Sequence, residues 1–108
     1  MSGVDLEKLM ADRLASLGAP VRLRLLRTLV RAGDGGIAVG ELQRKLGLAA
    51  STHAHHLGAL VKAGLVVQER RGREVICMAA FAAVRSVGSY LTDQCCADAT
   101  GDALSEAV

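Results

Sequence analysis

The segment from Ser51 to Met78, STHAHHLGALVKAGLVVQERRGREVICM, constrains the fold more than any other part of the chain. Its apolar residues first recur at helical spacing, and Gly64 then interrupts that pattern. Two short stretches with strand-like patterns follow, over 65–70 and 74–78, on either side of a tight turn at Arg71-Gly72-Arg73. The segment therefore predicts a helix that ends at Gly64 and leads directly into a β-hairpin with a basic tip.

The remainder of the chain is predicted to be mostly helical. Leucines at helical spacing before Gly18 indicate a first helix, and Pro20 suits the first turn of a second one. The second helix would bury Val21, Leu25, Leu26 and Leu29. A Gly-rich loop covers 32–36, and further helices are expected near 40–46, at 50–63 and from 79 to about 96. The helix at 50–63 would bury Ala54, Leu57, Leu60 and Val61. The predicted fold class is mainly α with a small β-hairpin, that is, about five helices and a two-stranded wing.

Basic charge is concentrated in the middle of the chain. The formal net charge of the 108 residues is only +2, but positions 20–85 hold eleven Arg or Lys against four acids, a balance of +7. From Ser86 onward there are four acids and no Arg or Lys. The middle is therefore suited to bind a polyanion, whereas the end would be repelled by one. We expect a single domain over 1–98 and a flexible acidic tail over 99–108.

Nothing in the sequence directs the chain to a membrane. Residues 1–19 carry acids and lack the basic-then-apolar order of a signal peptide. The longest uncharged apolar run, 75–84, is too short to span a bilayer. We expect a cytoplasmic protein with no membrane partner, whose thiols stay reduced.

The run GELQRKLGLAASTHAHHLGALVKAGLVVQERRGREVIC resembles the ArsR/SmtB family of bacterial metal- and metalloid-responsive repressors. The residues that carry the resemblance are His56-Leu57, Leu60 and Ala63-Gly64-Leu65-Val66. The order of helices around them also fits, so the resemblance covers nearly the whole chain. It implies a winged helix-turn-helix domain that binds double-stranded operator DNA as a homodimer, with dimerisation by the first and last helices.

The resemblance also implies which residues meet DNA. The exposed front of the recognition helix would carry Ser51, Thr52, His53 and His55. Gln43 would lie on the supporting helix near a phosphate, and the wing would present Arg70, Arg71 and Arg73. Hydroxyl and imidazole groups can bond to phosphates or base edges, whereas the arginines would supply affinity rather than sequence choice.

Two residues at the recognition helix are interpreted as structural and not as contacts to DNA. His56 falls on the family's hallmark position, which implies a structural hydrogen bond rather than metal ligation. Ala49 stands where the family often has a capping Ser. Without a capping side chain here the helix loses about 1 kcal/mol of stability, and Ser51 would partly substitute as the cap.

Three cysteines are candidates for a sensor. Cys77 lies on the second strand of the hairpin, and Cys95 and Cys96 are adjacent near the end of the last helix. Neighbours on a helix point about 100° apart, so the pair does not easily face one core. For Cys77 alone, the alternative interpretation is a small buried hydrophobe. Zinc usually takes four N or S ligands, whereas trivalent arsenic bonds to three sulfurs and a methylated arsenical to two. The ligand count favours arsenite or methylarsenite as inducer, with no cofactor required.

The Cys-Cys pair at the end of the last helix resembles one arsenic-sensing branch of the family. The supporting helix has no Cys, and the last helix lacks the acid and His set of zinc sensors. Where this branch often has a third Cys, the chain has Asp98 and Asp102. Cys77 is one candidate for the third ligand, and a two-sulfur site is the alternative.

The length of the last helix decides how Cys77 can take part. From Ala80 to Cys95 the helix is about 23 Å long, so the two thiols cannot easily meet within one chain. In dimers of the family the last helices pack antiparallel. We therefore expect a site shared between protomers, with Cys95 and Cys96 from one chain and Cys77 from the other.

Other functions remain open at this point. The Cys pair is also compatible with a thiol redox switch or a zinc- or cadmium-responsive repressor. A thiol enzyme is disfavoured because the chain has neither a Cys-x-x-Cys motif nor a phosphate loop, and no catalytic residue is assigned. A winged helix used only for protein contacts would leave the basic middle of the chain without a role.

Overall fold

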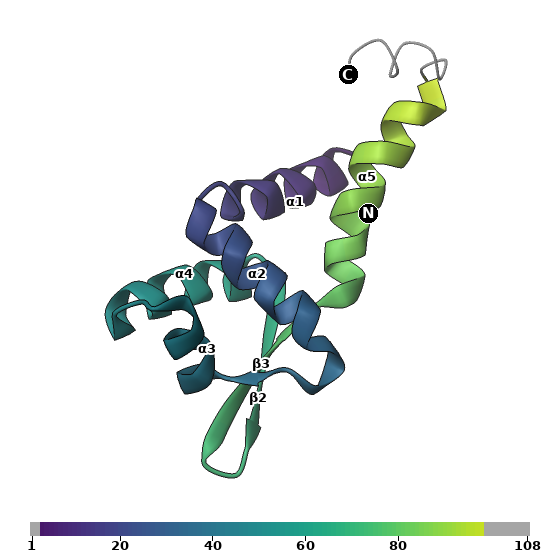
Figure 1. Cartoon of the computed structure of the whole chain (residues 1–108). Helices are drawn as coiled ribbons and strands as arrows, with labels where there is room; N and C mark the ends of the chain where they lie inside the picture. Colours follow the sequence, from purple (N-terminus) through teal and green to yellow (C-terminus); the bar gives the residue numbers. More distant parts are fainter. Residues whose placement is uncertain (1–2, 99–108) are drawn as a thin grey trace.

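The computed structural model describes residues 3–98, apart from the side chains of Val4 and of residues 94–98. The expected acidic tail at 99–108 lies outside the described residues. The helices are α1 (Gly3–Ser16), α2 (Pro20–Ala32), α3 (Val39–Leu46), α4 (Ala50–Lys62) and α5 (Phe81–Asp98). The strands are β1 (Ile37–Ala38), β2 (Val66–Arg71) and β3 (Glu74–Ala79), and a short 3₁₀ turn covers Gly33–Gly35. The predicted fold class, mainly helical with a hairpin wing, is confirmed (Figure 1).

The sheet has one strand more than the sequence predicts. β1 pairs antiparallel with β3, and β3 pairs antiparallel with β2, so that β3 is the central strand. Two residues are too short to show an alternating pattern, which is why β1 was missed. Gly36 precedes β1 at a φ of 70°, and a Cβ there would lie 2.5 Å from the carbonyl oxygen of Cys77. The close pairing of β1 with β3 therefore depends on a glycine at this position.

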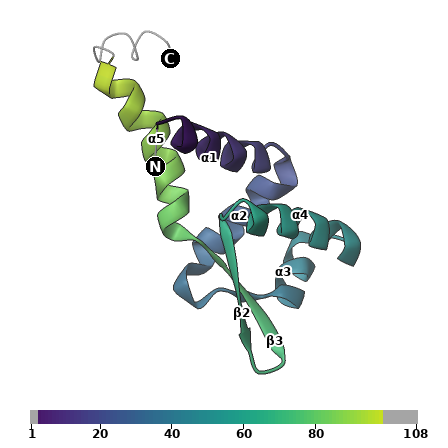
Figure 2. The ribbon, with the colours of Figure 1, turned by 180° about the vertical axis from the view of Figure 1, so that it is seen from behind.

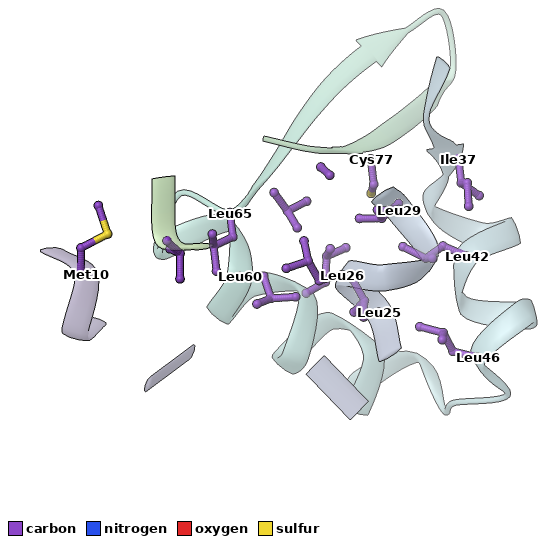
Figure 3. Packing of buried hydrophobic residues seen from close by; sticks show 14 residues of the cluster. Met10, Leu25, Leu26, Leu29, Ile37, Leu42, Leu46, Leu60, Leu65 and Cys77 are labelled. Carbon is purple, nitrogen blue, oxygen red and sulfur yellow. The ribbon is translucent and has the colours of Figure 1, made fainter. Parts of the chain in front are cut away.

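The core is centred on α2, whose inner face packs between the other helices and the sheet. Leu25, Leu26 and Leu29 are buried as predicted, while Val21 is half-buried. Figure 3 shows the aliphatic side chains of α2 and α3 converging below the strand that carries Cys77. Because Leu and Val dominate this cluster, its stability depends on close packing of aliphatic side chains rather than on aromatic rings.

The buried stripe of α4 differs from the predicted one at its two ends. His53, Leu57 and Leu60 are buried, whereas Ala54 is exposed and Val61 is half-buried. Both sets have helical spacing, and they differ by about 100° at their first member. Apolar periodicity favoured Ala54, but the packing of α4 places an imidazole in the core instead.

Only the first half of α5 packs against the rest of the fold. It packs beside α1 near its first half, where Val87 is buried, and its second half extends beyond the other helices (Figures 1 and 2). The end of α5 and the tip of the wing lie at opposite extremes of the molecule in both views. Among the described helices, none is long and apolar enough to cross a membrane.

Candidate nucleic-acid interface

α3 and α4 are joined by a short turn that Gln43 helps to fix. The backbone N–H of Gly47 donates to the carbonyl oxygens of Gln43 and Arg44, which ends α3. The half-buried side chain of Gln43 donates from Nε2 to the carbonyl oxygen of Leu48 at 3.2 Å. Gln43 therefore holds the turn between the two helices, and its contact with a phosphate stays a prediction.

The N-terminal end of α4 is open to solvent. Ser51, Thr52 and His55 are exposed, as expected for the front of a recognition helix. Ala49 supplies no cap, and no side chain caps the helix in its place, so Ser51 does not substitute for the missing cap. The first N–H groups of α4 are thus left without a side-chain acceptor, and such a helix end attracts anions.

The prediction that His53 lies on the exposed front of α4 is wrong. Its side chain is only 2% exposed, and its Nε2 atom has no hydrogen-bond partner among the described residues. Burial, with a smaller contribution from His56, lowers the pKa of His53 below its ordinary value of 6.5. A buried neutral imidazole is a part of the core and is not positioned to contact a base.

His56 makes the structural hydrogen bond that the resemblance implied. Its Nδ1 accepts a hydrogen bond from Nε of Arg22 on α2 at 3.1 Å. Within the described part of the chain there is also no cluster of three or more His, Cys, Asp or Glu that could hold a metal ion.

The three wing arginines are all exposed, but they differ in their partners. Arg71 donates from Nε and Nη2 to the carboxylate of Glu69, at 3.1 and 3.4 Å, and from Nη1 to the carbonyl oxygen of Gly35 at 3.5 Å. Its hydrogen bond and charge lower the pKa of Glu69. Arg70 and Arg73 form no ion pair with any residue that the structure describes. They are therefore the wing cations most available to phosphate oxygens.

Arg44 is an additional cation at this surface that the sequence analysis did not select. It lines, together with Arg73, a hollow of about 340 Å³ between the start of α3 and the wing. Glu41 and Glu74 line the same hollow and moderate its charge. An Arg on the solvent side of the supporting helix was visible in the sequence, but its proximity to the wing depends on the tertiary fold.

Cys77 is part of the core. Its side chain is fully buried on the central strand, opposite Ile37 on one side and Gln68 on the other. The sulfur points toward Leu29 of α2 in Figure 3 and accepts a 3.6 Å hydrogen bond from Nε2 of Gln68. Burial raises the pKa of this thiol, which opposes formation of the thiolate. This placement agrees with the small-hydrophobe interpretation and does not favour a ligand shared with a partner chain.

Cys95 and Cys96 lie in the last turn of α5, and their side chains are outside the described residues. Their backbone positions are at the extreme of the molecule opposite the wing tip (Figure 1). The structure therefore does not bring them together with Cys77 in one chain.

Comparison with known proteins identifies the class to which this architecture belongs. A helix-turn-helix domain family matches residues 17–69. An ArsR-like transcriptional regulator from Rhodococcus sp. RHA1 is 27% identical, with 79% of this chain and 77% of that chain covered and a TM-score of 0.69. The transcriptional repressor BigR from Xylella fastidiosa is 33% identical, with 84% and 95% covered and a TM-score of 0.60.

A third similar structure is the homodimeric winged helix-turn-helix DNA-binding domain Mb0332 from Mycobacterium bovis. It is 25% identical, with 87% of this chain and 95% of that chain covered and a TM-score of 0.65. A search of curated protein sequences gives no significant match. The fold and these similarities define a winged helix-turn-helix transcriptional regulator. The chain belongs to the ArsR family of such regulators.

Proposed function

We propose that this regulator is a homodimeric repressor that binds operator DNA through the N-terminal half of α4 and the wing. The observation that carries this proposal is the open end of α4, where Ser51, Thr52 and His55 are exposed beside uncapped backbone N–H groups. Hydroxyl, imidazole and N–H donors at a helix end suit phosphates and base edges in a major groove. Arg70 and Arg73, which have no described ion-pair partner, would add contacts to the backbone.

Dimerisation through α1 and α5 is supported by the exposed surface of α5. Leu91 is 47% exposed on this helix, and the second half of α5 extends past the other helices. The similar Mb0332 domain is a homodimer. Two copies related by a two-fold axis would present two α4 helices to a palindromic site.

The proposed inducer is a trivalent arsenical bound by Cys95 and Cys96. Adjacent thiols at the last turn of a helix are suited to two As–S bonds, and a methylarsenite needs no third sulfur. Each bond forms as a thiol gives up its proton and the arsenical loses a hydroxide, which together leave as water. Because Cys77 is fully buried in its own chain, the proposed site consists of the other two thiols only.

The test is fluorescence anisotropy with labelled DNA from upstream of the chain's own gene. Binding should weaken steeply with salt. Arg70→Gln with Arg73→Gln should lower the slope of log K against log salt by about 0.9 for each phosphate that the variant no longer neutralises. Absence of salt-dependent binding would contradict DNA recognition.

The same assay separates the inducers. Methylarsenite should release the DNA from the wild type and from Cys77→Ala, but not from the double variant Cys95→Ser/Cys96→Ser. If a folded Cys77→Ala variant does not respond to methylarsenite, the inducer site is instead the three-thiol site shared between protomers, with Cys77 as a ligand. If only zinc or cadmium releases the DNA, the inducer is a metal ion and not an arsenical. If peroxide releases it and dithiothreitol reverses the release, the inducing signal is oxidation of the thiols.

A further inference from the structure

Two arginines attach the recognition helix to the helices behind it. Arg22 of α2 donates from Nε to Nδ1 of His56, in the middle of α4, and from Nη1 to the carbonyl oxygen of Ser16 at 3.4 Å. Arg13 of α1 donates from Nε to the carbonyl oxygen of Ala63, just beyond the end of α4, at 3.2 Å. The two guanidinium groups thus contact α4 in its middle and the residue that follows its end.

The Arg13 contact lies at a helix end that is suited to a cation. The last carbonyl groups of a helix lack intrahelical partners and carry the negative end of its dipole. Gly64 follows at a φ of 80°, and a Cβ at this position would be in ordinary van der Waals contact with Nη2 of Arg13, at 3.4 Å. Ser16 is buried at the end of α1 and donates to the carbonyl oxygen of Arg13 at 2.6 Å, a hydrogen bond within the last turn of α1 itself.

We infer that Arg13 and Arg22 are positioning residues for DNA binding: they fix the orientation of α4 on α1, although neither contacts DNA. The inference rests on the proposed DNA binding through α4. α1, α2 and α4 adjoin in both views of the fold, so the hydrogen bonds connect the helix proposed for dimerisation with the one proposed to read DNA (Figures 1 and 2). A recognition helix that is free to tilt is in the orientation that binds DNA for only a fraction of the time. The apparent affinity for DNA is the intrinsic affinity multiplied by that fraction.

The test compares Arg13→Met and Arg22→Met with the control Arg27→Met in the full chain. Met keeps most of the apolar stem and removes the donors. Arg27 lies exposed on the outer face of α2 and makes no side-chain hydrogen bond within the described part of the chain. Arg13→Met and Arg22→Met, called the clamp variants below, should each bind operator DNA about tenfold more weakly than the wild type. Each of them lacks charge-assisted hydrogen bonds that hold α4. The slope of log K against log salt should stay as in the wild type, because the same number of phosphates is neutralised.

A second measurement distinguishes positioning from a general loss of structure. Amide NMR shifts should change over 56–63 in the clamp variants and stay unchanged in the wing. The milder variants Arg13→Lys and Arg22→Lys keep the charge but cannot reproduce the guanidinium geometry, and they should show an intermediate loss of affinity if a Met variant fails to fold. In a double-mutant cycle, Arg22→Met should weaken binding no further once His56→Leu is present.

Three results would overturn the inference. Unchanged affinity in the folded Met or Lys variants would show that α4 needs no clamp. A salt slope lowered by about 0.9 would show that the arginine contacts a phosphate directly. Additive losses for Arg22→Met and His56→Leu would show that the two residues act separately. Failure of the wild type itself to bind DNA would instead contradict the proposed function, so the two failures are distinguishable.

Discussion

The two ends of the recognition helix α4 are built in opposite ways. At the N-terminal end Ala49 gives no cap and the neighbouring polar side chains are exposed. At the C-terminal end the N–H of Gly64 bonds to Val61 and that of Leu65 bonds to Leu60, which together close a Schellman motif. Arg13 then accounts for the carbonyl of Ala63.

The difference shows how stability is distributed along a functional helix. Groups left unsatisfied at the first turn cost some free energy of folding, but they remain available to a ligand. The cost is offset at the far end, where backbone and side-chain hydrogen bonds fix the helix to the core. A helix capped equally well at both ends would be more stable and would have fewer donors to offer.

The largest expected change in stability comes from a substitution at the C-terminal end of α4. Gly64 has a φ of 80°, so Gly64→Ala forces an L-residue into the left-handed region. We expect a loss of about 2 kcal/mol in the free energy of unfolding, measured by chemical denaturation. The matched control is Gly58→Ala, in the interior of α4 with open space around it. This change should stabilise by about 0.5–1 kcal/mol, so equal effects at the two positions would contradict the comparison.

A smaller effect of opposite sign is expected at the open end. Ala49→Ser adds a side-chain acceptor at the N-cap position and should raise the free energy of unfolding by about 1 kcal/mol. Thermal melting measures the gain, and DNA anisotropy measures what the added cap does to phosphate binding. Unchanged stability would indicate that the first turn of α4 is already satisfied, and the two ends would then be less different than the hydrogen bonds suggest.

The smallest effect concerns a buried residue near the start of α4 and the dependence of stability on pH. His53 is held neutral by burial, with its pKa below 6.5, while the unfolded chain takes up a proton near that value. Folding stability is therefore complete above pH 6.5 and declines as the pH falls through the lowered pKa. His53→Leu should remove this decline. The two proteins should differ in pH dependence by less than about 1 kcal/mol at pH 6, measured by denaturation at pH 7.5 and 6. Parallel curves would show that other groups cause the acid sensitivity.

The elements were predictable because each has a strong local signal. The helices before and after Gly18, the stop at Gly64 and the turn at Gly72 depend on residues close in sequence, and the structure agrees with them. β1 was not predictable, since a two-residue strand is defined only by its partner β3.

The candidate site was predictable in outline and wrong at one position. Ser51, Thr52 and the wing arginines are exposed as expected, but the roles of His53 and Ala54 are exchanged. Periodicity places the apolar residue in the core, whereas the actual rotation of α4 is set by all its neighbours at once. Arg13 and Arg22 were missed for the same reason, because their partners lie 50 and 34 residues away in sequence.

The position of α5 turns a small angular change into a large displacement. The helix is held near its base, and Cys95 lies about 21 Å further along at 1.5 Å per residue. A tilt of about 5° at the base would move the backbone of Cys95 by about 2 Å. Under the proposed function, an arsenic atom bound by Cys95 and Cys96 would in turn exert a torque on the distant contact between α5 and α1. An inducer bound there, as proposed, would act on the recognition helix without any large change in the fold.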